Sequence, residues 1–546
     1  MDCNPIVLAF KMKLFLIEIS LLFSFYCFSQ NTVGVIYNNS ELSQEGYTLF
    51  APITSTETYL IDNCGQIINQ WSSSYTPGMC VYLLEDGSLL RACKSKIEGY
   101  AQAGKGGIIE RRSWNNELLW SWENCWPDSC LHHDIAPLPN GNILVVKAIK
   151  KTKKQSIDAG RDTTALRDGV LWTESIIEIK PIGINDAKIV WQWNAWDHLV
   201  QDFDQNKNNF GNVASHPELL DVNYNAKTIK NPDILHINSI AYHNKRDQIL
   251  ISLRNTNEIW IIDHSTTMQD AAKHKGGVYG HGGDILYRWG NPIIYKGTGK
   301  QLLDGQHDAK WIPEGQRFEN MISVFNNGVG KRRSEALIIQ PPYNAKTKVF
   351  EKQKEEGFMP DTCVWSYTQT NLFSGRLSSI QSLENGNYLI CEAAKGVFTE
   401  VTFEKDTVWK YVNPVSPLEI LSQGCVSSSA NTSFRCQKYS KNYKAFDNKI
   451  IFPKGTIEYN TILGKCKLES VASTQKIKYD FDSSKQCIKL KNNSNQTIKL
   501  LNYWGITVSH KTYLPNSTIS LDSLPPSIYH LSNEFGETTK IIFINK

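Results

Sequence analysis

Residues 305–315 read Gly305-Gln306-His307-Asp308-Ala309-Lys310-Trp311-Ile312-Pro313-Glu314-Gly315, and this stretch decides the fold because it recurs. Its closest echo is His133-Asp134-Ile135-Ala136-Pro137-Leu138-Pro139-Asn140-Gly141. Both stretches run from a His-Asp pair through an apolar segment to a Pro-x-Gly turn. In the copy at 133–141, a strand-like apolar run follows the turn at 142–146. Two copies indicate a repeat.

Weaker copies lack the histidine but keep the rest of the pattern. They lie at 79–90, 238–251 and 378–390. An apolar strand, a turn of the Asp-Gly or Asn-Gly kind and a second apolar strand form a β-hairpin. Hairpins that recur at intervals of tens of residues indicate a propeller or a solenoid.

Tryptophan-bearing strands alternate with these hairpins, at 67–71, 118–122, 189–193, 285–289, 363–367 and 407–411. Their aromatic and polar residues alternate as in a half-exposed outer strand. The pattern predicts an all-β chain, a six-bladed β-propeller with four strands in each blade, in which the tryptophans pack between blades. Because the strand of Trp71 precedes any complete hairpin, we expect the two chain ends to share a blade and so to leave no open sheet edge.

The two ends of the chain differ from the propeller segment, which we place at residues 31–455. Residues 1–30 combine a short basic start with an apolar run, which is typical of a signal peptide, and an N-terminal membrane anchor is the alternative. Residues 464–546 are rich in Ser, Asn and Lys and predict a small β-sandwich. A net charge of +4 over 546 residues disfavours nucleic acid as a partner.

Three pairs of cysteines lie close in sequence, and an exported chain meets an oxidising compartment. Disulfides are therefore expected at Cys125 and Cys130, Cys425 and Cys436, and Cys466 and Cys487. The other cysteines leave the connectivity open. No pair has C-x-x-C spacing, so a structural zinc site is disfavoured.

Three histidines are expected to converge, because His133, His236 and His307 each stand at the start of an inner strand and inner strands line the propeller channel. Asn238 follows in the hairpin of His236 and Arg254 ends it. Arginine offers forked donors and neutral imidazole offers a nucleophile or a proton carrier, which suits a tetrahedral oxyanion. The alternative is that these histidines are satisfied core residues.

The remaining histidines stand outside this register. His198 is an alternative member of the site, although its loop position favours a structural role, and His243, His264, His274 and His281 are assigned to the surface. Long insertions near 150–175, 197–232 and 265–284 are expected to form surface loops or short helices. The stretch Gly99–Lys105 has the spacing of a phosphate loop, but Gly106 replaces the required Ser or Thr, so we interpret it as a flexible hairpin loop.

Several motifs together resemble the bacterial aryl-sulfate sulfotransferases over roughly residues 31–455. They are Asp233-Ile234-Leu235-His236-Ile237-Asn238-Ser239, Ser252-Leu253-Arg254, Leu131-His132-His133-Asp134, Gln306-His307-Asp308-Ala309, and the run from Gly282 to Pro292. The resemblance implies a six-bladed propeller that moves a sulfuryl group from a phenolic sulfate ester to a phenol through a sulfohistidine. It implies no phosphoadenosine phosphosulfate, no other cofactor and no metal.

The resemblance also assigns roles to residues. His307 matches the nucleophile, and His236, Asn238 and Arg254 match the sulfuryl-binding residues. The acid/base histidine falls on the doublet His132-His133, of which His133 is favoured because it shares the Asp-flanked register of His307. His132 and Arg376 are assigned to substrate binding, with Arg376 in place of a later-blade lysine that has no secure counterpart.

The C-terminal segment resembles the type A sorting domain of type IX secretion, carried by its strand-rich character and the run from Leu524 to Tyr529. The implied partner is the type IX secretion machinery, and the implied location is secreted or cell-surface after periplasmic transit, with later removal of the segment.

Two other functions were weighed against sulfuryl transfer. One is a metal-dependent hydrolase with histidine ligands, which Arg254 disfavours because a guanidinium repels a dication. The other is a non-catalytic secreted propeller that binds a glycan or an anionic polymer. The expected partners are small-molecule aryl sulfates and phenols, with a homodimer left open.

Overall fold

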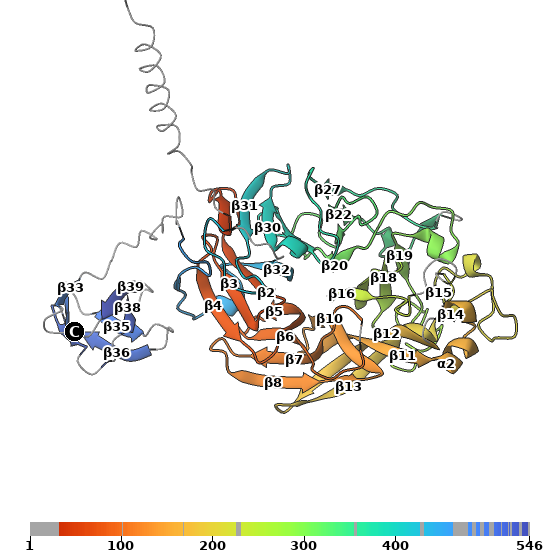
Figure 1. Cartoon of the computed structure of the whole chain (residues 1–546), viewed down its shortest axis with the longest axis horizontal. Coiled ribbons are helices and arrows are strands. Elements are labelled where there is room, and N and C mark those ends of the chain that lie inside the picture. Colours follow the sequence, from red (N-terminus) through yellow and green to blue (C-terminus); the bar gives the residue numbers. More distant parts are fainter. Residues whose placement is uncertain are drawn as a thin grey trace, which may run out of the picture.

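The computed structural model describes residues 32–461, except for 101, 167–168, 225, 227–230, 354–356 and 426–430, and strands with short connections between 479 and 543 (Figure 1). The all-β prediction is confirmed, since strands dominate these ranges. The helices described are α2 (Lys153–Asp158) and the 3₁₀ turns Thr163–Ala165, Ala195–Asp197, Val213–Ser215, Pro292–Tyr295, Ala393–Lys395 and Lys444–Phe446. None of the described helices has the length and apolar character needed to cross a membrane.

Six antiparallel sheets carry the main strands of the described part from 34 to 440, and three of them take all their strands except β32 from the first half of this segment. The first is β32 (Ser433–Ser440), β2 (Gly46–Pro52), β3 (Glu57–Ile61) and β4 (Ile67–Ser72). The second is β5 (Pro77–Leu83), β6 (Leu89–Lys94), β7 (Gly107–Arg112) and β8 (Leu118–Glu123). The third is β9 (Cys125–Trp126), β10 (Ser129–Pro137), β11 (Ile143–Thr152), β12 (Val170–Ile182) and β13 (Asp186–Asn194).

The other three sheets follow in chain order. They are β16 (Ile237–His243), β17 (Gln248–Leu253), β18 (Glu258–Asp263) and β19 (Tyr287–Trp289); then β20 (His307–Trp311), β21 (Ile322–Asn326), β22 (Glu335–Ile339) and β27 (Trp365–Tyr367); then β28 (Ser379–Ser382), β29 (Tyr388–Glu392), β30 (Val397–Val401), β31 (Thr407–Val412) and β1 (Gly34–Asn38). Short pairs lie outside the sheets: β14 (Leu199–Val200) with β15 (Leu220–Asp221), β23 (Tyr343–Asn344) with β24 (Val349–Phe350), and β25 (Lys352–Gln353) with β26 (Gly357–Phe358).

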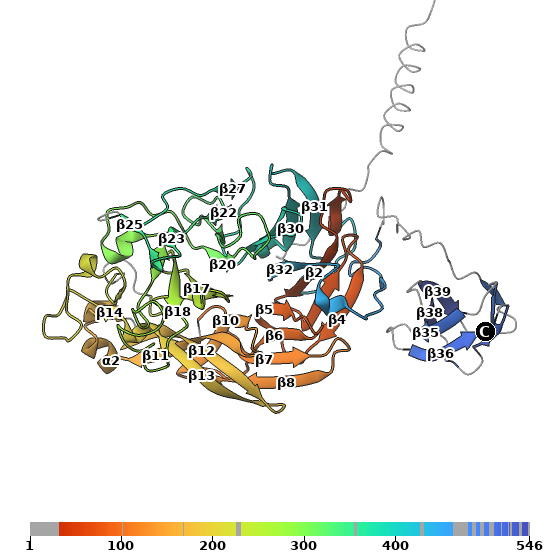
Figure 2. The ribbon, with the colours of Figure 1, turned by 180° about the vertical axis from the view of Figure 1, so that it is seen from behind.

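The inner strands of these sheets contact one another in a closed cycle, as in a β-propeller. β5 contacts β10, β10 contacts β16, β16 contacts β20, β20 contacts β28, β28 contacts β32, and β32 contacts β5. Figure 2 shows β4, β8 and β13 at the outer rim of the same arrangement. Strands β10, β16 and β20, which contain or directly follow His133, His236 and His307, therefore meet at the centre.

The two ends of the propeller segment interlock, as expected from the position of Trp71. β32 supplies the inner strand beside β2, with Tyr47 opposite Tyr439, and β1 adds an outer strand to β31. Each end thus covers an edge strand that would otherwise be exposed.

The outer-strand tryptophans connect each sheet to the next by one repeated hydrogen bond. The indole N–H donates to a backbone carbonyl of the following sheet or its loops at 2.7–3.1 Å, in the pairs Trp71 to Ser113, Trp120 to Asp186, Trp191 to Thr266, Trp289 to Pro360, Trp365 to Phe403 and Trp409 to Asn63. The last pair returns to the first sheet. These indoles are buried, so the prediction that they pack between sheets is confirmed.

The insertions take mixed forms. The insertion near 150–175 carries the short helix α2, in line with the expectation of loops or short helices, and it also lengthens β11 and β12. The segment 197–232 contributes the β14–β15 pair, and within 265–284 the structure assigns turns and bends but no strand.

The C-terminal segment forms two sheets among its described residues. One contains β33 (Tyr479–Asp482), β34 (Cys487–Leu490) and β37 (Thr518–Ser520); the other contains β36 (Thr507–Tyr513), β35 (Gln496–Leu501), β38 (Ser527–Asn533) and β39 (Thr538–Phe543). Ile488 from the first sheet and Ile498 from the second belong to one hydrophobic cluster. The β-sandwich stays a prediction.

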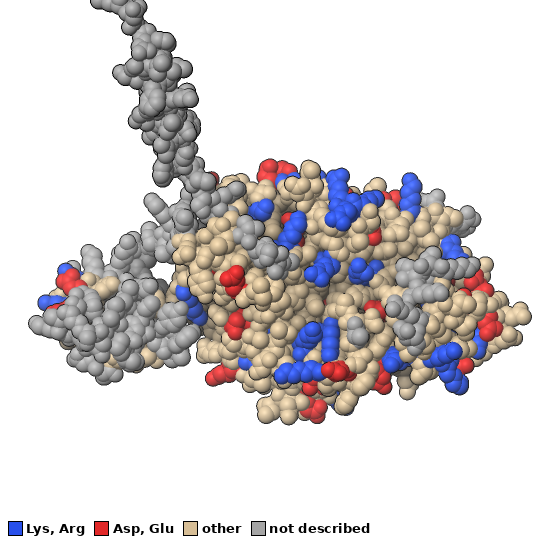
Figure 3. Space-filling view, viewed as in Figure 1, with Lys and Arg blue, Asp and Glu red and all other residues tan. Residues whose placement is uncertain are grey.

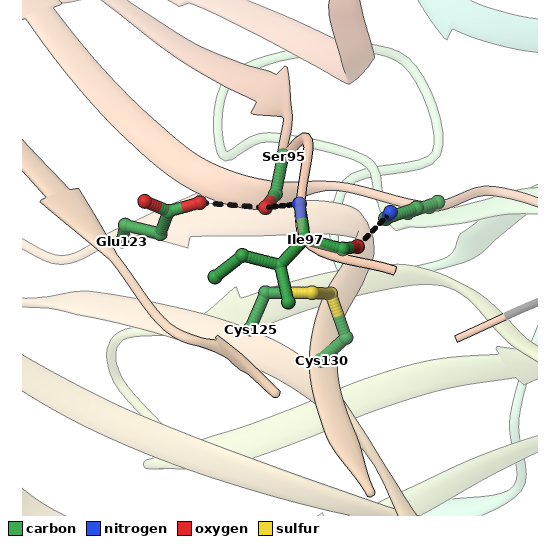
Figure 4. Close-up of a disulfide and its surroundings, with 6 residues drawn as sticks. Ser95, Ile97, Glu123, Cys125 and Cys130 are labelled. Atoms are coloured by element: carbon green, nitrogen blue, oxygen red, sulfur yellow. Dashed lines mark hydrogen bonds between the residues drawn. A yellow bond between two sulfur atoms is a disulfide. The ribbon is translucent and has the colours of Figure 1, made fainter. Parts of the chain in front are cut away.

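The structure confirms one of the expected disulfides and contradicts another. The Cys125–Cys130 disulfide is confirmed and joins β9 to β10 (Figure 4). The expected Cys425–Cys436 pair is wrong, because both are free thiols. Cys487 is also free, and Cys466 lies outside the described residues. Cys64, which we left unassigned, is disulfide-bonded.

Candidate functional site

Each site histidine lies within or next to a register shift of an inner strand, of the kind that a β-bulge produces. The pairing register shifts between Leu131 and Ile135, between Ile237 and Ser239, and between His307 and Lys310. At these bulges His133, His236 and Asp308 have positive φ angles of 52°, 59° and 56°. Side chains other than glycine adopt this conformation at an energetic cost, and such residues gather at functional sites. The recurring His-Asp motif is thus the local signature of a bulge that turns its side chain.

The bulges bring the predicted histidines together. The rings of His133 and His236 lie 4.6 Å apart, centroid to centroid, edge to face. Burial lowers the pKa of His133 well below its usual value, and nearby His236, His132 and His307 lower it further. The surroundings of His133 therefore favour its neutral form.

His307 is held in one tautomer by its neighbours. Asn327 donates its amide N–H groups to the carbonyls of Ser374, at 2.6 Å, and Leu377, at 3.0 Å. Its Oδ1 therefore faces His307 Nδ1 at 2.8 Å, and the Gly305 carbonyl lies 3.0 Å from the same nitrogen. Two acceptors require the proton on Nδ1, which leaves the lone pair on Nε2.

The lone pair of His307 Nε2 accepts a hydrogen bond from the backbone N–H of Leu377 at 3.1 Å. Burial lowers the pKa of His307 to about 3, and the charge of Arg254 lowers it while the hydrogen bond from Asn327 raises it. The imidazole is therefore neutral at physiological pH, and a neutral imidazole nitrogen with a lone pair is chemically able to act as a nucleophile.

A chain of buried groups leads to His133. Glu174 on β12 places Oε2 2.5 Å from His132 Nε2, and His132 Nδ1 lies 2.8 Å from His133 Nδ1. Burial raises the pKa of Glu174, while His132 lowers it. The carboxylate can stabilise a proton on His132, and His132 can pass one to His133.

The other residues predicted for the site, His236, Asn238 and Arg254, each have a hydrogen-bond partner. His236 Nδ1 lies 2.6 Å from the Asp233 carboxylate. Buried Asn238 donates to the Gln306 carbonyl at 2.7 Å, which ties β16 to the bulge of His307. Arg254 is partly exposed, donates to Asn255 at 3.3 Å and influences the pKa of His307.

Arg376 differs from the rest of the predicted set. Its side chain is exposed, and it is the backbone of the next residue, Leu377, that contacts His307. The structure therefore places a peptide N–H, and not this guanidinium, against His307.

An ionic cluster lies beside the histidines. Asp134 accepts from Arg435 at 3.0 Å and from Lys310 at 3.0 Å, and Asp308 lies 3.2 Å from Arg435. Burial would raise the pKa of Asp134, but Arg435 and Lys310 hold it at about 2. The aspartates of both His-Asp motifs thus share one arginine, which fixes the two bulges relative to each other.

The loop containing Gly104 corrects our interpretation of a flexible hairpin. His133 N–H donates to the Gly104 carbonyl at 2.9 Å, and a Cβ at Gly104 would lie 1.9 Å from His133 Cε1. Gly104 also has a φ of +76°, which favours glycine. The loop covers the imidazole, and only glycine allows this approach.

Residues near the loop anchor it beside the disulfide (Figure 4). Ser95 Oγ donates to Glu123 at 2.6 Å and accepts from the Ile97 N–H at 3.0 Å, while Lys105 donates to the Ile97 carbonyl. The Cys125–Cys130 disulfide packs against Gly107, since a Cβ there would lie 3.3 Å from Cys130 Sγ.

Sequence reasoning missed four residues that the structure brings to these histidines: Glu174, Asn327, Gly104 and Leu377. Each touches a site imidazole, but each comes from a strand or loop outside the repeated motif. On the face in Figure 3, Lys and Arg side chains gather near the middle of the propeller, a favourable field for an anionic substrate.

A cavity of about 440 Å³ lies outside the histidine site, since none of His132, His133, His236 and His307 lines it. It is lined by the insertions, with Trp196, Phe210, His216 and His274 among its walls.

Known proteins were compared with the chain. A protein of unknown function from Bacteroides caccae shares 11% identity with a TM-score of 0.36, covering 72% of this chain and 99% of that one. The β-propeller domain of Myceliophteria thermophila Cps50 (Swd1) shares 9% identity with a TM-score of 0.35, covering 71% of this chain and 88% of that one. No curated protein matches. The sequence model of arylsulfotransferase (ASST) matches residues 32–444, and the chain therefore belongs to the arylsulfotransferase family.

Proposed function

We propose that this arylsulfotransferase is a six-bladed propeller enzyme that transfers a sulfuryl group from a phenolic sulfate ester to a phenolic acceptor, without phosphoadenosine phosphosulfate. The observation that carries the proposal is the state of His307: a buried imidazole with its proton fixed on Nδ1 and its lone pair on Nε2, beside His133, His236 and Arg254.

The first step is attack of His307 Nε2 on the ester sulfur. The S–O bond to the phenol breaks as the N–S bond forms, and the sulfuryl group is carried by His307. Arg254, His236 and Asn238 are the proposed donors to the sulfuryl oxygens, where charge spreads during transfer. The Leu377 N–H donates a hydrogen bond to the Nε2 lone pair in this structure, so this bond must break before the attack. The same N–H is then close enough to bind a sulfuryl oxygen.

The leaving phenolate takes a proton from His133 Nε2. In the same event His133 Nδ1 takes the proton of His132 Nδ1, so that His132 ends neutral with its Nε2–H on Glu174. His133 then has a free lone pair on Nε2 and serves as the base for the acceptor phenol. Reversal of the relay restores the starting state, so no charge has to remain on His133, whose pKa is strongly lowered.

Mixing the purified protein with an aryl sulfate, in the absence of any nucleotide, tests this function by intact mass. We expect a sulfuryl adduct that maps to His307 and disappears when a phenol is added, with formation of the new aryl sulfate. A protein that binds the aryl sulfate but releases no phenol in a single turnover would be a non-catalytic propeller instead.

We further propose that residues 1–30 are a signal peptide and that residues 464–546 direct type IX secretion and are then removed. The apolar N-terminal run and the short strands of the C-terminal segment support this. The mature protein recovered from its native host should begin near Asn31 and lack the C-terminal segment; full-length protein in the cytosol would contradict the proposal.

A further inference from the structure

The loop insertions hold a second cluster of histidine and carboxylate groups, outside the histidine site. His198 Nδ1 and His274 Nδ1 each lie 2.8 Å from the same oxygen, Asp284 Oδ1. One donor atom from each residue lies within 4.8 Å of the other two. His274 and Asp284 belong to one loop, but His198 comes from a segment 86 residues before Asp284, so the fold brings it to the other two.

His198 faces acceptors on both ring nitrogens. Its Nε2 lies 2.9 Å from the carbonyl of Ala271, while its Nδ1 faces the carboxylate. A neutral imidazole has only one N–H, so it can satisfy one of the two acceptors. An imidazole that donates Nε2–H to a backbone carbonyl and presents the Nδ1 lone pair to a carboxylate is the arrangement of a metal ligand with its supporting hydrogen bond.

The surroundings fix His198 firmly. It is 1% exposed, and its ring stacks on Trp193 at 5.8 Å with an interplanar angle of 8°. Trp193 donates its indole N–H to the Gly283 carbonyl at 2.7 Å. A Cβ at Gly283 would lie 2.6 Å from His198 Nε2, so glycine is required where the loop passes over the imidazole.

The loop from 265 to 284 is folded back on itself around these groups. Gly283 N–H donates to the Lys273 carbonyl at 3.0 Å, and Gly282 N–H donates to the Gly276 carbonyl at 2.9 Å. These bonds hold His274 and Asp284 side by side although the segment has no strand. Asp284 is buried, whereas the side chain of His274 is 58% exposed and also lines the cavity of about 440 Å³.

We propose that His198, His274 and Asp284 bind a divalent transition metal, Zn²⁺ in the first place. Two imidazoles and one carboxylate suit zinc, which prefers four tetrahedral ligands. Donors around zinc lie about 3.3 Å apart for bonds of about 2.0–2.1 Å, so the 2.8 Å contacts need only open slightly. Water fills the fourth position, since exposed His274 gives access from solvent. The ion cross-links β13, through the segment after it, to the 265–284 loop.

Metal binding is measured on the full chain, stripped with a chelator and then titrated with Zn²⁺ alone. We expect close to one zinc ion per chain by elemental analysis and a higher unfolding temperature with zinc than without it. The test variant is His274→Ala, because this exposed side chain can be removed without opening the core; its Kd for zinc should be at least about tenfold weaker.

The matched control is His216→Ala, an exposed histidine that lines the same cavity and pairs with Glu218 at 2.9 Å, outside the cluster. It should bind zinc as the unchanged protein does. Equal zinc binding by the unchanged protein and His274→Ala, or no zinc uptake at all, would overturn the proposal. The metal-free proteins should unfold at similar temperatures, which separates lost binding from misfolding. Sulfuryl transfer between phenols is measured in parallel. Because zinc binding is measured directly, its result stands whether or not the transfer activity is found.

Discussion

Replacing Glu174 by Gln tests the relay that leads to His133. The substitution keeps the shape and the acceptor oxygen but removes the negative charge 2.5 Å from His132 Nε2. All three members of the chain are buried, so water does not replace the lost charge. His132 then loses the partner that stabilises its protonated form.

The size of the effect follows from Coulomb attraction. Two unit charges about 4 Å apart interact by about 4 kcal/mol at an effective dielectric constant near 20. That energy corresponds to roughly a thousandfold loss in the step that needs the proton of His132. This lies inside the range of about 10² to 10⁴ that general acid catalysis contributes.

The assay varies the leaving phenol. With a strongly acidic phenol, whose phenolate leaves without a proton, Glu174→Gln should react nearly as fast as the unchanged enzyme. The loss in kcat should grow as the pKa of the leaving phenol rises, which gives a steeper Brønsted slope for the variant. A purely structural role of Glu174 would lower all rates by the same factor.

Glu178→Gln is the matched control. Glu178 lies on the same strand, β12, and also contacts a histidine, with Oε2 3.0 Å from His264 Nε2, but it is outside the site. It should leave the Brønsted slope unchanged. If Glu174→Gln keeps the slope of the unchanged enzyme, the relay is wrong.

Three other predictions follow from single contacts. His307→Ala should yield no sulfuryl adduct by intact mass, and an adduct on this variant would reassign the nucleophile. Arg254→Lys should form the adduct slowly. It should lose more in kcat than in donor binding, because lysine lacks the forked donor geometry of arginine. Gly104→Ala should lower transfer at least about tenfold while far-ultraviolet circular dichroism is retained, because the added Cβ would displace His133; full activity would show that the loop is not held against it. For His264, burial lowers the pKa, but Asp247 and Glu178 outweigh it and raise the pKa to about 9. The contribution of His264 to the free energy of unfolding is therefore complete below pH ~6.5 and is lost as the pH rises through about 9. The loss is about 1–2 kcal/mol after discounting for the exposure of Asp247. Denaturant unfolding of His264→Gln should not show this decline in stability with pH.

The repeat could be predicted from the sequence because its signals are local. Alternation along a strand, the Asn-Gly and Asp-Gly turns and the tryptophan strands depend on neighbours a few residues away. The recurring His-Asp pair also placed His133 and His307 at equivalent positions, and His236 followed from the hairpin register. That is why the histidines are found together at the centre, although the roles assigned to them remain predictions.

Tertiary structure decided what supports those histidines. Glu174 reaches His132 from β12, two strands away from β10, and Asn327 reaches His307 from the turn after β21; no sequence motif marks either residue. The sequence around Gly104 indicates only a flexible hairpin loop, yet this loop lies against His133. The Cys125–Cys130 disulfide could be predicted because the two residues are near neighbours in sequence, whereas the expected partner Cys436 is a buried free thiol.

The sequence by itself determined the strands, their turns and the register that repeats, since these are set by the chemistry of adjacent residues. Only the closed ring of sheets decided which side chains from different strands touch. Proton position on His307 and His133 depends on those contacts, because a hydrogen bond at 2.5–3.1 Å is made or lost by shifts far smaller than sequence spacing can specify.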